Sequence, residues 1–223
     1  MEYHETSTVG NRVVRLGHYA RHLAEAAGAK PALCELIMKA SPLHDIGKLG
    51  VPAQILRKSE KLTAPEREQM QRHPEIGAEI IGKHHDRLLK LARILALTHH
   101  ERWDGSGYPS GVRGNDIPWA GRIMAVVDAF ESMTATQCHR DPMPVDLAVN
   151  EILSGSGKQF DPQIVDAFGD VLAESPKAGL RQRPSRKASS SACACVSMII
   201  CAIPWLFYSN INNVISPVLR SPR

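Results

Sequence analysis

Apolar residues recur every three or four positions over most of residues 13–172, a spacing typical of helices that bury one face. The first apolar stripe ends near Gly28, and Pro31 favours the first turn of a second helix that the pattern extends towards His44. The sequence has neither the alternation typical of strands nor an internal repeat. The pattern therefore predicts an all-α helical bundle.

Local capping signals predict where further helices begin. Thr63 and Glu66 form a capping box for a helix that extends past His73. Asp161 directly before Pro162 is a good cap for the last helix of the bundle. Two more helices are expected over residues 88–100 and 117–136.

The distribution of charge divides the chain into two parts. Residues 1–175 hold all 23 acidic residues and 20 of the 27 basic ones, whereas residues 176–223 hold seven basic residues and no acid. We expect one domain over residues 1–175. Residues 176–223 read as a basic linker followed by an apolar run at 192–208, either unstructured or a weak membrane anchor.

Cysteine usage and the N-terminus favour the cytoplasm. Three of the five cysteines lie in the tail and the other two are isolated, so the sequence does not suggest a disulfide framework. Met1 leads almost directly into helical sequence, without the apolar run and cleavage site of a signal peptide. We expect a cytoplasmic protein and no DNA or RNA partner.

Imidazoles and carboxylates stand at several prominent positions of this helical pattern. They are His44, Asp45, His73, His99, His100 and Asp128. Nitrogen and oxygen donors without cysteine suit a pair of hard-to-borderline metal ions rather than a structural zinc site. Paired ions of this kind usually hydrolyse phosphate esters, so the chemistry predicts a metallophosphohydrolase.

The adjacent histidines pose a geometric problem. Side chains at His99 and His100 would point about 100° apart on a helix and could not share one face. Either the two rings serve different ions, or one of them lies near the helix end, where the geometry relaxes. Residues 99–118 contain four glycines and two prolines, which predicts a shaped loop directly after the pair.

Four stretches of the sequence together resemble the HD-GYP family. They are HDIGKLG at 44–50, HHERWDGSGYPSGVRG at 99–114, RIMAVVDAF at 122–130 and GKQFDP at 157–162. The family comprises bacterial phosphodiesterases of the HD metal-dependent phosphohydrolase superfamily, associated with hydrolysis of cyclic di-GMP. The resemblance covers roughly residues 5–172 and implies an HD-domain-like helical bundle with a glycine-rich loop.

The resemblance also implies roles for individual residues. Two divalent ions, iron or manganese, would be held by Glu5, His44, Asp45, His73, His99, His100 and Asp128. Asp45 would bridge the ions, and Lys48 would contact the scissile phosphate. The Gly107-Tyr108-Pro109 loop would border the substrate and could contact diguanylate cyclase domains. The chain could also form a homodimer.

Two positions depart from the family pattern. Val9 stands where members often carry a metal-binding histidine, which leaves Glu5 as the nearby candidate ligand. Gln137 replaces an arginine expected to grip the substrate, and Arg140 is the remaining cationic candidate.

These residues predict a metal-dependent phosphodiesterase that hydrolyses cyclic di-GMP in second-messenger signalling. Two alternatives stay open because of the departures at positions 9 and 137. One is a catalytically impaired module that binds nucleotide or partner proteins. The other is an HD phosphohydrolase that acts on another nucleotide.

Overall fold

The computed structural model describes residues 3–135 and 141–174, with side chains described from Arg12 onward. The chain divides into two units, Met1–Leu172 and Ala173–Arg223, and nearly all described residues belong to the first. The expectations for the tail at 176–223 therefore fall outside the described residues. In the part of the chain that is described, no helix is long and apolar enough to cross a membrane.

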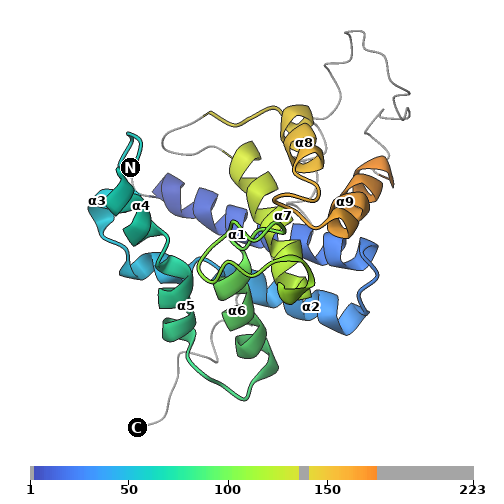
Figure 1. Ribbon diagram of the computed structural model, residues 1–223, viewed down its shortest axis with the longest axis horizontal. Helices are drawn as coiled ribbons and strands as arrows, with labels where there is room; N and C mark the ends of the chain where they lie inside the picture. Colours follow the sequence, from blue (N-terminus) through green and yellow to red (C-terminus); the bar gives the residue numbers. More distant parts are fainter. Residues whose placement is uncertain (1–2, 136–140, 175–223) are drawn as a thin grey trace. The chain divides into compact units, whose positions relative to one another are not determined.

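The described residues form an assembly of helices joined by short turns and one long loop (Figure 1). The α-helices are α1 (Tyr3–Ala26), α2 (Pro31–Ala40), α3 (Ala53–Leu56), α4 (Ala64–Met70), α5 (His73–Ile81), α6 (Arg87–Thr98), α7 (Trp119–Thr134), α8 (Val145–Ser154) and α9 (Pro162–Glu174). Three 3₁₀ helices are η1 (Ser41–Leu43), η2 (Ile46–Gly50) and η3 (Gly114–Asp116). Over the described ranges, the only β pairing is an isolated bridge between Ser156 and Phe160. The predicted all-α class is confirmed.

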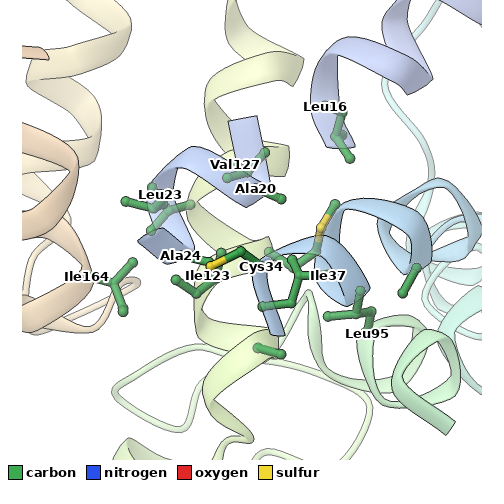
Figure 2. Close-up of a cluster of buried hydrophobic side chains, with 14 of the residues drawn as sticks. Leu16, Ala20, Leu23, Ala24, Cys34, Ile37, Leu95, Ile123, Val127 and Ile164 are labelled. Atoms are coloured by element: carbon green, nitrogen blue, oxygen red, sulfur yellow. The ribbon is translucent and has the colours of Figure 1, made fainter. Parts of the chain in front are cut away.

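The core lies where the apolar stripes of the helices meet (Figure 2). Its members include Leu23 from α1, Ile37 from α2, Leu95 from α6, Ile123 from α7 and Ile164 from α9, all at most 3% exposed, and α5 and α8 add Ile81 and Ile152. Removing these stripes from water is the main stabilising contribution to such a bundle. The core holds α6 and α7 together, and both helices carry candidate metal ligands.

The helix expected from Thr63 past His73 is divided in two. The capping box of Thr63 and Glu66 forms as predicted at the start of α4. That helix ends at Met70. The next helix, α5, begins at His73, and Pro74 is its second residue. Proline has no N–H for a helical hydrogen bond and is favoured in a first turn, which explains the break. His73 therefore lies at a helix start rather than in mid-helix.

Candidate metal centre

The His-Asp pair lies in a turn between two 3₁₀ helices. The sequence suggested that one helix continues towards His44, but α2 ends at Ala40 and η1 follows it. His44 follows η1 and Asp45 precedes η2. The turn places both side chains next to the start of α5, because η2 packs against that helix.

Four of the predicted ligands form one cluster. Asp45, His73, His99 and His100 each offer a ligand atom, and these atoms all lie within 4.8 Å of one another. Asp45 Oδ1 lies 3.4 Å from His73 Nε2 and 3.7 Å from His99 Nε2. The two histidine Nε2 atoms are 3.3 Å apart. Residues from three separate segments thus converge on a volume the size of a metal ion and its ligands.

His44 and Asp128 adjoin this four-residue cluster without belonging to it. His44 Nε2 lies 3.4 Å from Asp45 Oδ2 and 3.5 Å from Asp128 Oδ1. The two oxygens of Asp45 therefore face different neighbours: Oδ1 faces His73 and His99, and Oδ2 faces His44.

Backbone carbonyls orient three of the histidine rings. His44 Nδ1 lies 2.7 Å from Ser41 O, His73 Nδ1 lies 2.7 Å from Met70 O, and His99 Nδ1 lies 2.9 Å from Leu95 O. A carbonyl oxygen can only accept, so each Nδ1 donates the hydrogen. In a neutral ring this leaves the lone pair on Nε2, the atom that faces the cluster. Metal-binding histidines are commonly oriented in this way.

His99 and His100 reach the same cluster because the helix ends between them. His99 is the C-terminal cap of α6, and His100 lies in the turn beyond it. Their ring centroids are 4.0 Å apart, at an interplanar angle of 44°. Of the two geometries that the sequence left open, the relaxed helix end is the one observed.

Buried polar atoms without hydrogen-bond partners, in the cluster and beside it, show that this site fits a metal ion. Within the described residues, His44 Nε2 and Asp45 Oδ1 are buried and have no hydrogen-bond partner. A buried polar atom without a partner is costly, and coordination of a cation removes that cost. The two Nε2 lone pairs of His73 and His99, 3.3 Å apart, also repel each other unless a cation or proton lies between them.

The electrostatics of the centre differ between its histidines. Burial, together with the nearby His99 ring, lowers the pKa of His73 to about 4 and that of His100 to about 3. These rings are neutral at pH 7 and ready to coordinate. Burial also acts to lower the pKa of His44, but the carboxylates of Asp128 and Asp45 outweigh it and raise the value to about 10.

The other predicted site residues surround the cluster. Lys48 forms an ion pair with Asp45. The Tyr108 ring stacks on His100, with centroids 4.8 Å apart, and Pro109 follows through a cis peptide bond. A Cβ at Gly107 would lie 2.6 Å from His100 O, so only glycine allows the loop to approach so closely.

A cavity of about 470 Å³ opens beside the cluster. Its wall includes His99, His100, Gly107, Tyr108 and Asp128 among the predicted residues. The cavity volume is within the usual range of small-molecule sites. The structure thus brings the glycine-rich loop and part of the cluster to one binding cavity.

The expectations for four positions fall outside the described side chains. Glu5 lies in α1, but its side chain is not described, and neither is that of Val9. Gln137 and Arg140 lie in the segment 136–140, which is not described. Their expected roles stay predictions.

Sequence reasoning missed the role of Arg122 at this site. Its guanidinium donates to Ile117 O at 2.8 Å, to Asn115 Oδ1 at 3.0 Å and to Asp161 Oδ2 at 3.0 Å. It also lies 5.5 Å from the centroid of the Trp103 ring. Arg122 therefore ties the glycine-rich loop to α7 and to the cap of α9. Its place in the RIMAVVDAF stretch was the available sequence signal, but its partner Asp161 is 39 residues away in the chain.

Residues 4–164 match the HD domain family, and the chain belongs to that family in its HD-GYP group, as the sequence predicted. It is 42% identical over 167 residues to a cyclic di-GMP phosphodiesterase of Thermotoga maritima, covering 75% of this chain and 45% of that protein. It is 41% identical over 157 residues to the 3'3'-cGAMP-specific phosphodiesterase 2 of Vibrio cholerae serotype O1, covering 70% and 30%. The chain thus spans less than half the length of these relatives.

A solved structure shares the fold. Bd1817, an HDG"Y"P protein from Bdellovibrio bacteriovorus, superposes with a TM-score of 0.58 at 19% identity. The superposition covers 73% of this chain and 51% of that one. At this level of identity the likeness supports the helical fold and its topology.

Proposed function

We propose that residues 1–175 form the catalytic domain of a metal-dependent phosphodiesterase that hydrolyses cyclic dinucleotides in second-messenger signalling, with cyclic di-GMP as the preferred substrate. The observation that carries this proposal is the convergence of Asp45, His73, His99 and His100 beside a cavity of about 470 Å³. Relatives that act on cyclic di-GMP and on 3'3'-cGAMP support the substrate class.

The two faces of Asp45 support a site for two ions. One ion would be held by Asp45 with His73, His99 and His100, and the other by Asp45 with His44 and Asp128. Glu5 is the proposed additional ligand. Divalent ions bound there would neutralise phosphoryl charge and lower the pKa of a water molecule. Nitrogen and oxygen donors favour iron or manganese.

Two residues of the chain itself would contact the phosphate of the substrate, one through its charge and one through a hydroxyl proton. Lys48, paired with Asp45, is placed to stabilise negative charge that develops on the phosphate. Burial and the nearby carboxylates of Asp128 and Asp45 raise the pKa of Tyr108, so its hydroxyl stays protonated and can donate to a phosphate oxygen. The stacked His100 ring fixes the direction of that tyrosine. Contacts of this loop with diguanylate cyclases, dimer formation and a cytoplasmic location stay predictions.

Replacement of one ligand tests the proposal. In the full chain purified with Mn²⁺, we expect Asp45→Asn to lower bound metal and to reduce kcat on cyclic di-GMP by at least about 100-fold, because removing even an outer partner of a metal ligand commonly costs 10–100-fold. Asp170→Asn, at an exposed position of α9, is the matched control and should retain both.

The substrate panel for this experiment is cyclic di-GMP, 3'3'-cGAMP and mononucleotides. Rapid cleavage of mononucleotides with both cyclic dinucleotides untouched would contradict the proposal. Wild-type protein that binds cyclic di-GMP without turnover would instead identify an impaired binding module.

A further inference from the structure

The cavity wall beyond the metal centre carries hydrogen-bonding groups that the proposed chemistry does not use. Glu151 from α8 and Gln159 from the following turn both line the cavity, together with Phe160. In the part of the chain that the structure describes, the Glu151 carboxylate makes no hydrogen bond or ion pair. Glu151 is solvent-exposed, so its carboxylate is available to accept hydrogen bonds from a ligand that enters the cavity.

Glu101 supplies an independent indication. It is 3% exposed, lines the same cavity, and is fixed because its Oε1 accepts from Ser110 N at 2.8 Å. Its Oε2 is buried and has no partner among the described residues. A buried carboxylate oxygen without a donor is costly, and this one belongs to a residue that lines the same cavity as Glu151.

The fold brings these groups next to the cluster. Met143, just before α8, donates from its N–H to Met133 O near the end of α7 at 2.8 Å, and α8 packs against α7 (Figure 1). The cavity wall therefore includes Asp128 from α7 as well as Glu151 from α8. A ligand whose phosphate lies at the metal centre can reach Glu151 across the same cavity.

We propose that Glu151, with the wall formed by Gln159 and Phe160, is a base subsite that selects guanine over adenine. This inference rests on the proposed cyclic dinucleotide phosphodiesterase function. Both carboxylate oxygens of Glu151 are acceptors, and guanine presents two adjacent donors, N1–H and the 2-amino group. Adenine presents an N1 lone pair at the corresponding position, which repels a carboxylate. The partly exposed Ala125 and the edge of Phe160, which is only 3% exposed, give this part of the wall an apolar surface.

Glu151→Gln tests the subsite, because glutamine keeps the size of the side chain but loses the charge and one acceptor. With the full chain loaded with Mn²⁺, kcat/KM is measured on cyclic di-GMP, 3'3'-cGAMP and cyclic di-AMP. We expect the variant to lose roughly tenfold on cyclic di-GMP, the effect of one charge-assisted hydrogen bond pair. Its rate on cyclic di-AMP should stay equal or rise. Asp146→Asn, an exposed acid on the same helix, is the control and should leave the ratio unchanged.

The outcomes separate this inference from the function on which it rests. An equal loss on all three nucleotides, or no loss on any, would overturn the subsite and leave the phosphodiesterase function standing. If wild type hydrolyses none of them, the proposed function fails, and the subsite is decided by equilibrium binding of cyclic di-GMP and cyclic di-AMP. A preference for the guanine ligand that Glu151→Gln removes would support the subsite; equal affinities or no binding would reject it.

Discussion

Gly47 shows how a residue without a side chain holds the candidate metal centre together. It lies in η2, two residues after Asp45, where the backbone approaches the start of α5. A Cβ at this position would lie 1.9 Å from His73 O and 2.4 Å from Gly77 N. Both contacts are with backbone atoms, which cannot move aside as a flexible side chain can. The close approach therefore fixes Asp45 relative to His73.

We expect Gly47→Ala to destabilise the fold by about 3 kcal/mol, because overpacking forces the backbone of α5 away from η2. The same shift should reduce bound metal. Gly169→Ala is the matched control: it lies in α9, where an added Cβ meets nothing within 4 Å, and should stabilise by about 0.5–1 kcal/mol. Urea unfolding and metal analysis measure both effects. Equal stabilities of the two variants would contradict the role of the close approach.

The chemistry of individual residues could be predicted from the sequence better than their surroundings. The motif and donor types of Asp45 and His73 predicted a metal centre, and the structure brings both into one cluster that could hold an ion. The free carboxylate of Glu151 in the cavity wall carried no signal, because an exposed acid on an amphipathic helix reads as solvated surface.

At the scale of elements, one buried acid connects two helices. Glu131 of α7 is fully buried and accepts from Arg12 Nε at 2.5 Å and from Arg15 Nη2 at 2.6 Å, both on α1. This link joins helices more than 100 residues apart in the chain, which apolar periodicity could not predict.

We expect Glu131→Gln to lower the free energy of unfolding by about 2 kcal/mol. The change removes the buried carboxylate charge that pairs with Arg12 and Arg15. The value is discounted because each arginine side chain is 36% exposed and screened by water. Glu35→Gln breaks the exposed pair with Arg21, which also links α1 to another helix, and should cost less than about 1 kcal/mol. Chemical unfolding of both variants compares them. A larger loss in Glu35→Gln would contradict the buried link.

Helix boundaries were predictable where a local signal sets them. The capping box at Thr63 is local, and α4 begins there as predicted. The end of α4 and the end of α2 were missed, because apolar periodicity continues through both breaks. In each case proline follows, at Pro42 and Pro74, and it favours a new first turn over continuation of the old helix.

At the scale of the whole molecule, the candidate metal centre links segments that lie far apart in the sequence. Its ligands come from the turn after η1, the start of α5, the end of α6 and the middle of α7. These segments are up to 84 residues apart, from His44 to Asp128. An ion that binds only the folded arrangement therefore stabilises the packing of several helices at once.

Removal of metal should consequently lower the thermal stability of the domain. An ion present at 100 times its Kd contributes about 2.7 kcal/mol, and for a domain of this size 1 kcal/mol shifts Tm by roughly 2–4 °C. We therefore expect a strong chelator to lower the Tm of the wild-type protein by about 5 °C or more, and added Mn²⁺ to restore it. Asp45→Asn should start from the lower Tm and respond weakly to either addition. Calorimetry measures these shifts, and an equal response of Asp45→Asn would place the stabilising ion elsewhere in the protein.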